Sequence, residues 1–324
     1  MEFKTEVEFT KNIDFATFTK AVIIADKNVV EQFANNDFPM FKLNATEKNK
    51  NLETVQQIYT FFQENNVNRA TTIIGIGGGI TTDIAGFAAA TYMRGCRLVL
   101  VPTTLLAMID ASIGGKSAVN FQNTKNNIGT FYPAEKIIVN LDFLNSLSEN
   151  EMQNGITEII KTALIKESSL VEKLLNREDL KEIIKQTIEL KLSICQLDLH
   201  DKGERRLLNL GHTFGHIIEV LSNYEISHGN AVAIGIRLVV KISLLNRLIS
   251  ETDFGKINNL LDLYNLPKKI NLEFTEKEVT ALLLKDKKMT TNANLILFNG
   301  FQKAIVKQVS VAEFYRYFSM LKTI

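Results

Sequence analysis

The first 144 residues alternate between short apolar runs and longer segments with helical spacing. "NLETVQQIYTFFQENN" and "TTDIAGFAAATYM" have apolar residues on one helical face and predict helices. Strands alternating with helices predict a parallel, Rossmann-like α/β sheet with helices on both faces. The apolar runs that predict buried strands are "KAVIIAD", "RATTIIGIGGG", "CRLVLVPTT" and "KIIVNLDFL".

After Leu144 the pattern changes, and helical periodicity prevails. A chain of 324 residues is too long for one ordinary core. We therefore expect an α/β domain over residues 1–144 and an all-α domain over residues 145–324. The chain contains no linker rich in Pro, Gly or Ser, so we expect the two domains to pack tightly around a cleft.

Composition narrows the function classes. Hydrophobic residues make up 45% of the chain, charged residues 23%, and the net charge is +1. These values favour a soluble globular protein and argue against nucleic acid or an anionic membrane as a partner. The apolar stretch "AVAIGIRLVVKISLL" contains Arg237 and Lys241, which argues against a membrane span. The acidic N-terminus and the isolated Cys96 and Cys195 indicate a cytoplasmic protein with reduced thiols.

A glycine-rich loop follows one predicted strand and precedes a helix. In "TTIIGIGGGITTDIAG", glycines allow the backbone to approach a phosphate at the helix N-terminus. Ile80 occupies the last glycine position of the dinucleotide fingerprint, so a tight strand–helix turn is the alternative. Thr103 and Thr104 follow the next strand, where their hydroxyls suit ribose or phosphate, or cap a helix.

Three of the four histidines lie between residues 209 and 235. His212 and His216 share a helical face, and His228 precedes another helical stretch. Two histidines with one carboxylate are typical of a zinc site with an open position, and Glu158 is a candidate for the carboxylate. Glu219 is a candidate to orient an imidazole. Histidines buried in a core are the alternative, but three in one short stretch favour a site.

Buried or clustered cations point to an anionic ligand. Lys191 falls on the apolar stripe of a predicted helix, where an ammonium needs an anion unless its side chain extends to solvent. Lys116 follows a Gly-Gly turn, and Arg205 lies shortly before His212. These positions favour a substrate with phosphate or carboxylate groups.

Several motifs together resemble the 3-dehydroquinate synthase family, within the sugar phosphate cyclases. The resemblance extends from about Asp26 to Lys288, in the order typical of the family. "GHTFGH" followed by "HGNAV" is its most specific part. The other motifs are "GGGITTDIAGFAAATYMRG", "VPTTLLAMIDASIGGKSAVN", "KNNIGTFYPA", "GITEIIKTALI" and "KDKK".

The resemblance implies an NAD-binding α/β domain, a helical metal-binding domain, an active site in the cleft between them and a homodimer. It implies a Zn2+ or Co2+ ion held by Glu158, His212 and His228. His216 would line the phosphate pocket, and Arg94 would reach the phosphate in the neighbouring subunit. The implied substrate contacts are Asp110, Lys116, Asn126, Lys161, Lys191, Arg205, Asn209 and Lys287. The implied NAD contacts are Asp26, Glu47, Lys50, Gly78, Gly79, Asp83, Thr103, Thr104 and Lys125.

The implied activity is a phosphate-eliminating lyase of the shikimate pathway of aromatic amino acid biosynthesis. It converts 3-deoxy-D-arabino-heptulosonate 7-phosphate to 3-dehydroquinate with catalytic NAD+. Arg205 and Lys191 favour a substrate that carries both a phosphate and a carboxylate. The alternatives are another sugar phosphate cyclase, a metal-dependent alcohol dehydrogenase and an inactive relative.

The chain departs from the family pattern at two motif positions. Thr82 replaces a glycine of the cofactor loop, and Asn230 replaces the glutamate of "HGEAV". We expect Thr82 to crowd the loop by one side chain. Asn230 lies close to His228 in sequence but is not an implied ligand, so we expect metal binding to persist.

Overall fold

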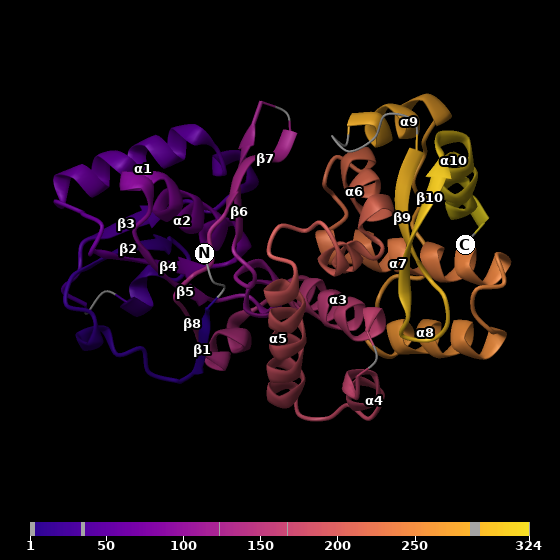
Figure 1. Cartoon of the computed structure of the whole chain (residues 1–324), viewed down its shortest axis with the longest axis horizontal. Coiled ribbons are helices and arrows are strands. Elements are labelled where there is room, and N and C mark those ends of the chain that lie inside the picture. Colours follow the sequence, from indigo (N-terminus) through magenta and orange to yellow (C-terminus); the bar gives the residue numbers. More distant parts are fainter. Residues whose placement is uncertain (1–3, 34–35, 123, 167, 286–291, 324) are drawn as a thin grey trace. The chain divides into compact units, whose positions relative to one another are not determined.

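The computed structural model describes residues 4–33, 36–122, 124–166, 168–285 and 292–323 (Figure 1). The implied substrate contact Lys287 lies outside the described residues. The chain divides into two compact units. Unit 1 comprises residues 1–152 and 191–200, and unit 2 comprises residues 153–190 and 201–324.

Unit 1 is built on a six-stranded sheet in which all pairs are parallel, in the order β1-β8-β5-β4-β2-β3. Its central strands consist almost entirely of buried residues, as expected for a sheet covered on both faces. The predicted Rossmann-like sheet is therefore confirmed. Its strands are β1 (Glu6–Phe9), β2 (Ala21–Asp26), β3 (Met40–Leu43), β4 (Thr72–Gly77), β5 (Arg97–Pro102) and β8 (Lys136–Val139).

Two α-helices of unit 1, α1 (Leu52–Glu64) and α2 (Gly79–Thr91), pack against each other beside the sheet (Figure 1). In the β1–β2 and β2–β3 connections, the helical structure of the described residues is limited to the short 3-10 turns Phe15–Thr17 and Val30–Phe33. Right-handed crossovers place these two connections on the face opposite α1 and α2. The described residues of these two connections form no α-helix, so the expectation of helices on both faces is wrong for that face.

Strands β6 (Lys116–Phe121) and β7 (Thr124–Phe131) form an antiparallel hairpin, which lies between β5 and β8 in the chain. It packs on α2, and its register shifts between Val119 and Phe121. Before it, the chain forms a π-helical turn over Ala107–Ala111. Such turns and register shifts often occur beside functional sites.

Unit 2 is mostly helical, as predicted, but it also contains an antiparallel hairpin that the periodicity did not reveal. The hairpin pairs strand β9 (Asn292–Phe298) with strand β10 (Ala304–Ser310). The elements are α3 (Glu149–Ile165), α4 (Leu170–Leu175), α5 (Leu180–Leu197), α6 (His212–Leu221), α7 (His228–Leu245), α8 (Glu251–Leu263), α9 (Glu276–Lys285), β9 (Asn292–Phe298), β10 (Ala304–Ser310) and α10 (Val311–Phe318). Two of the three unit boundaries fall within helices, one in α3 and one in α5, and the third follows α5.

Helix α7 forms part of the core of unit 2. Among the described residues it is the one helix long and apolar enough to cross a membrane, and 72% of it is buried within the protein. Arg237 in its middle is buried and donates to the Pro267 carbonyl oxygen, Asn258 and Asp262. A core helix of a soluble protein has these properties.

Candidate active site

Three helices of unit 2 bring one carboxylate and two imidazoles together. Glu158 of α3 is completely buried, and its Oε1 lies 3.5 Å from His212 Nε2 and 3.3 Å from His228 Nε2. The three ligand atoms lie within 4.8 Å of one another. The sequence paired His212 with His216 on one helical face, and the family resemblance implied His212 and His228 as ligands with Glu158. In the structure, His212 and His228 both face the Glu158 carboxylate.

Both rings are oriented so that Nε2 faces Glu158. His212 Nδ1 lies 3.1 Å from the Leu210 carbonyl oxygen, which can only accept, so Nδ1 carries the proton. His228 Nδ1 lies 3.3 Å from Glu219 Oε2. A carbonyl or carboxylate on the second ring nitrogen is the usual support of a metal-binding histidine. The His212 Nε2 atom is therefore available as a ligand, and the His228 Nε2 atom becomes available when a metal ion displaces its proton.

The donor set fits a divalent ion of the zinc or cobalt type. Neither carboxylate oxygen of Glu158 has a hydrogen bond of normal geometry within the described chain, although Lys161 Nζ lies 2.5 Å from Oε2. A buried carboxylate in this state is costly unless a cation compensates it. One carboxylate with two imidazoles is also a donor set that zinc and related ions prefer.

The titration of the three groups follows from their burial and mutual contacts. Burial lowers the pKa of His212 to about 3 and keeps its ring neutral. Burial alone would lower the pKa of His228, but the facing carboxylates of Glu158 and Glu219 raise it to about 10. Burial would raise the pKa of Glu158, but Lys161 and the histidines hold it well below its usual value. The site thus favours positive charge, which a divalent ion would also supply.

Close backbone contacts at glycines hold these helices together. An added β-carbon at Gly235 of α7 would lie 2.1 Å from the Gly211 carbonyl oxygen, just before α6. Gly211 has φ +77°, a conformation that side chains other than glycine disfavour. Gly229 fits against α3 in the same way, where Asn154 Oδ1 accepts a hydrogen bond of 2.8 Å from the Gly229 amide. The arrangement of Glu158, His212 and His228 therefore depends on two tight contacts, one between Gly235 and Gly211 and one between Gly229 and Asn154.

Three further implied substrate residues lie close to His212 in the sequence, and they differ in solvent exposure. The His216 ring centroid lies 5.4 Å from that of His212 and 6.2 Å from that of His228, and His216 is exposed. Arg205 is buried in the 3-10 segment Glu204–Asn209. Asn209 is exposed and donates to the Arg206 carbonyl oxygen.

In unit 1, the glycine loop meets the end of β5. An added β-carbon at Gly78 would lie 3.2 Å from Thr104 Cγ2, and one at Gly79 would lie 3.3 Å from Ala111 Cβ. The Thr104 hydroxyl accepts from the Ala107 amide and thus also caps the following turn, while Thr103 is buried. The carboxyl edge of the sheet therefore forms a narrow glycine-lined surface at the start of α2, which suits a phosphate.

A polar network lies beside this loop. Lys50 is 5% exposed, forms a short ion pair with Asp83 and donates to Asn126 Oδ1 at 2.6 Å. Burial raises the pKa of Asp83, and Lys50 opposes this shift. Glu47 accepts a hydrogen bond of 2.7 Å from Asn120 Nδ2. The structure thus brings together three implied NAD contacts and the implied substrate contact Asn126.

Lys191 has an anionic partner within the protein. Its side chain is buried, forms a short ion pair with the Asp110 carboxylate and donates to the Asp110 carbonyl oxygen at 2.6 Å. Asp110 belongs to the π-helical turn. The buried ammonium expected from the apolar stripe is present, and Asp110 compensates its charge.

The remaining implied contacts of unit 1 lie outside its core. Asp26 ends β2 at the carboxyl edge of the sheet, where its side chain accepts from the Asn28 amide. Lys116 and Lys125 are exposed residues of the β6–β7 hairpin. Arg94 is exposed after α2 and has φ +63°, and its neighbour Met93 has φ +50°. Consecutive non-glycine residues in this conformation are uncommon and often mark functional segments.

Of the two departures from the family pattern, Thr82 is accommodated, whereas Asn230 leaves a buried polar atom without a partner in the described chain. Thr82 is buried in the first turn of α2, where its hydroxyl donates to the Gly79 carbonyl oxygen at 3.1 Å. The Thr82 side chain is therefore buried against its own helix and does not project freely into the glycine loop. Asn230 follows Gly229 in α7, and its Oδ1 is buried without a hydrogen-bond partner in the described part of the chain.

Sequence reasoning missed two residues that organise the sites. Asn120 links Glu47 to the Asn126 backbone, and Asn154 anchors the start of α7. Each side chain has a partner more than 70 residues away in sequence: Glu47 for Asn120 and the Gly229 amide for Asn154. In the sequence, these two asparagines stand only within a family motif or beside one. That position does not indicate which residue each side chain contacts.

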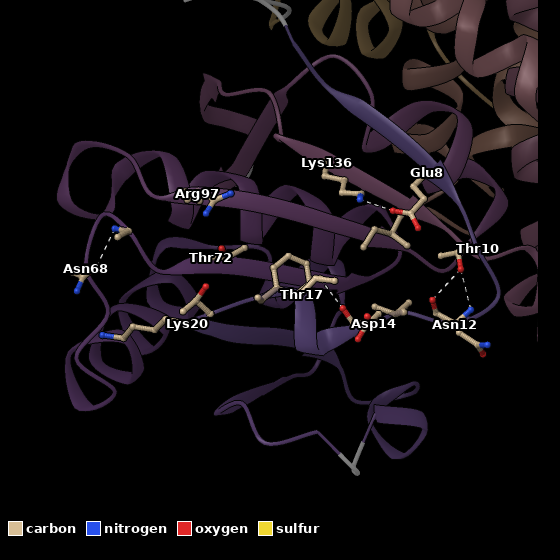
Figure 2. A pocket seen from close by; sticks show the side chains of 15 residues that line it. Glu8, Thr10, Asn12, Asp14, Thr17, Lys20, Asn68, Thr72, Arg97 and Lys136 are labelled. Atoms are coloured by element: carbon tan, nitrogen blue, oxygen red, sulfur yellow. Dashed lines mark hydrogen bonds and ion pairs between the residues drawn. The ribbon is translucent and has the colours of Figure 1, made fainter.

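A pocket at another edge of unit 1 is a different feature. It has a volume of about 540 Å³ and includes residues that begin β4, β5 and β8, whereas the glycine loop follows the end of β4 (Figure 2). Its cations are already engaged: Lys136 with Glu8, Arg97 with Glu135 at 2.9 Å, and Lys20 with the Asn66 carbonyl oxygen at 2.7 Å. Ligands of open α/β sheets bind at the opposite, carboxyl edge, so we do not assign this pocket to the active site.

Comparison with known proteins agrees with this geometry. Residues 40–154 match the family described as 3-dehydroquinate synthase N-terminal, and residues 155–289 match 3-dehydroquinate synthase C-terminal. A 3-dehydroquinate synthase of Pyrococcus abyssi is 40% identical over 268 residues, which cover 80% of this chain and 78% of that protein.

Solved structures of related cyclases have the same fold. A 2-epi-5-epi-valiolone synthase from Streptomyces hygroscopicus with NAD+ and Zn2+ bound has a TM-score of 0.89 and 26% identity, covering 100% of this chain and 98% of that chain. A 2-deoxy-scyllo-inosose synthase complexed with carbaglucose-6-phosphate, NAD+ and Co2+ has a TM-score of 0.86 and 25% identity, covering 98% and 96%. With both halves matched and the relative's identity this high, the chain belongs to the 3-dehydroquinate synthase family.

Proposed function

We propose that this protein is a 3-dehydroquinate synthase, a lyase that converts 3-deoxy-D-arabino-heptulosonate 7-phosphate to 3-dehydroquinate and phosphate. The observation that carries the proposal is the buried Glu158 facing two Nε2 atoms in a chain whose two halves both match this family. The proposal places the protein in the shikimate pathway of aromatic amino acid biosynthesis. We assign NAD+ binding to an N-terminal domain of residues 1–144 and metal binding to a domain of residues 145–324.

Glu158, His212 and His228 would hold Zn2+ or Co2+. Gly78, Gly79, Thr103 and Thr104 would contact NAD+ at the carboxyl edge of the sheet, where the glycine backbone leaves room for phosphate. When bound, NAD+ supplies a reversible hydride acceptor and the metal ion supplies a Lewis acid. The other proposed NAD contacts are Asp26, Glu47, Lys50, Asp83 and Lys125.

The substrate is a sugar phosphate that also carries a carboxylate. Lys116, Lys191 and Arg205 would neutralise these anionic groups by charge-assisted hydrogen bonds. Lys191 already holds an anion, Asp110, so substrate must share or displace this partner. The other proposed contacts are Asp110, Asn126, Lys161, Asn209, His216 and Lys287.

We further propose that the protein is a cytoplasmic homodimer in which Arg94 acts on the neighbouring subunit. The exposed Arg94 and its left-handed backbone support this role. Mixing inactive Arg94→Ala with inactive His212→Ala tests it, because each mixed dimer would regain one complete site. About a quarter of wild-type activity should return if roughly half of the dimers are mixed. An inactive mixture in which mixed dimers are shown to form would contradict action across subunits.

A second candidate function is another sugar phosphate cyclase reaction, favoured by the likeness to the 2-deoxy-scyllo-inosose and 2-epi-5-epi-valiolone synthases. Phosphate release from 3-deoxy-D-arabino-heptulosonate 7-phosphate, with catalytic NAD+ and added Zn2+ or Co2+, separates the candidates. Phosphate and 3-dehydroquinate without net NADH would support the first proposal. No release by protein that binds metal and NAD+ would reject it, and sedoheptulose 7-phosphate would then be assayed.

A further inference from the structure

Asn120 occupies a special position in the β6–β7 hairpin. The register of the hairpin shifts there, so that Val119 pairs with Ile128 whereas Phe121 pairs with Thr124. The extra residues of β7 lie opposite Asn120 and include Asn126. Such an irregularity releases backbone groups from the ladder and redirects side chains.

The side chain of Asn120 uses both its donor and its acceptor. Oδ1 accepts a hydrogen bond of 2.9 Å from the Asn126 amide, and Nδ2 donates to Glu47 Oε1 at 2.7 Å and to the Glu47 carbonyl oxygen at 3.1 Å. The backbone N–H of Asn120 in turn donates to the Lys50 carbonyl oxygen at 2.7 Å. One residue thus connects the hairpin to the segment between β3 and α1.

The hydrogen bond to Asn126 has a particular consequence. Asn126 has φ +51°, a left-handed conformation that a non-glycine residue adopts only when its surroundings hold it. In this conformation its Oδ1 accepts from the buried Lys50 Nζ, which also pairs with Asp83. Asn120 therefore supports the partner of Lys50 at the same time as it holds Glu47.

We propose that Asn120 is a positioning residue that holds Glu47 for NAD+ and Asn126 for the sugar phosphate. This inference rests on the proposed function, because the roles of Glu47 and Asn126 belong to it. The two halves of the Asn120 amide serve different partners. The side-chain Nδ2 donates to Glu47, a proposed NAD+ contact, and the side-chain Oδ1 accepts from the Asn126 backbone amide.

Two substitutions separate these halves. Asn120→Ala removes both, whereas Asn120→Asp keeps an acceptor for the Asn126 amide but loses the donor and places a carboxylate against Glu47. Thr124→Ala is a matched control, since Thr124 is an exposed residue of the same hairpin. NAD+ affinity is measured by calorimetry, KM and kcat by phosphate release, and folding by the thermal midpoint.

We expect the Kd for NAD+ to rise about tenfold in both Asn120 variants, the loss expected for a hydrogen bond to a charged group. The KM for 3-deoxy-D-arabino-heptulosonate 7-phosphate should rise in Asn120→Ala and stay near the wild-type value in Asn120→Asp. Thr124→Ala should change neither constant. This split between the two variants would not follow from a general loss of stability.

Wild-type NAD+ affinity in Asn120→Ala would overturn the inference. Equal changes of both constants in the Ala and Asp variants, accompanied by a lowered thermal midpoint, would also overturn it and indicate a purely structural role. Wild-type protein that binds NAD+ and releases phosphate upholds the proposed function whatever the Asn120 variants do. A wild-type protein that does neither rejects the proposed function itself.

Discussion

Gly229 and Asn154 are in such close contact that a β-carbon added to Gly229 would lie 2.4 Å from Asn154 Cα. The Gly229 amide donates a hydrogen bond of 2.8 Å to Asn154 Oδ1. This contact sets the first turn of α7, which begins at His228, against α3, which carries Glu158. The spacing between two of the proposed metal ligands therefore depends on the absence of one side chain.

Gly229→Ala is expected to separate α7 from α3. Since real β-carbons essentially never approach another atom so closely, we expect a loss of about 1–3 kcal/mol of stability and weaker Zn2+ binding. Gly255→Ala is the control, because α8 leaves open space at Gly255 and alanine favours a helix by about 1 kcal/mol there. Thermal midpoints measure the stability of both variants, and chelator competition measures their Zn2+ affinity. Equal thermal midpoints and equal Zn2+ affinities in the two variants would show that the close contact at Gly229 is not required.

His212→Ala and His216→Ala should differ in metal content. Removing His212 deletes a proposed ligand, so metal binding and activity should be lost together. Removing the exposed His216 should abolish activity while about one Zn2+ per chain remains. Metal analysis of the two purified variants tests the assignment. An inactive His212→Ala protein with stoichiometric metal would show that His212 is not a ligand.

Glu219 should control metal affinity through His228. Its Oε2 lies 3.3 Å from His228 Nδ1, and it is 7% exposed. Glu219→Leu removes this acceptor and should weaken Zn2+ binding by roughly 10–100-fold. Glu219→Gln retains a carbonyl acceptor and should lose less. Competition with a chromophoric chelator measures both, with Glu189→Leu, an exposed glutamate of α5, as the control. Equal affinities in all three variants would argue against this role.

The Arg237–Asp262 ion pair should make stability depend on pH. Arg237 Nη2 lies 2.7 Å from Asp262 Oδ1. Burial alone would raise the pKa of Asp262, but hydrogen bonds from Lys268 and Arg237 lower it below its usual value. Asp262→Asn should cost about 1 kcal/mol at pH 7, because the carboxylate is 32% exposed and partly screened.

The stabilisation by Asp262 is fully present above its unfolded pKa, about 3.9, and is lost as the pH falls through the lower folded pKa. The difference between wild type and Asp262→Asn in urea unfolding should therefore narrow below about pH 4. Lys268→Gln, at a side chain that is 70% exposed, should have a smaller effect at pH 7. A constant difference from pH 7 to pH 3 would contradict the assignment.

The parallel sheet and the predominance of helices after Leu144 were predictable because they follow from local periodicity. The β9–β10 hairpin was missed, although each of its strands has seven residues and is longer than any strand of the parallel sheet. The expectation of helices on both faces of the sheet was also wrong, because the described residues of the two connections on one face form 3-10 turns and no α-helix. Local pattern indicates the type of an element more reliably than its presence in a short connection.

By itself, the sequence determined which groups could take part in a site. The spacing of His212 and His216 on a helix, the glycines after β4 and the lysine on an apolar stripe are all local properties. Only the tertiary structure decided which of these groups meet. Glu158 faces His212 and His228 because glycines let α3, α6 and α7 approach closely, and Lys191 is compensated by Asp110 because the π-helical turn lies beside α5. Such pairings depend on close packing between segments distant in sequence, which no local pattern encodes.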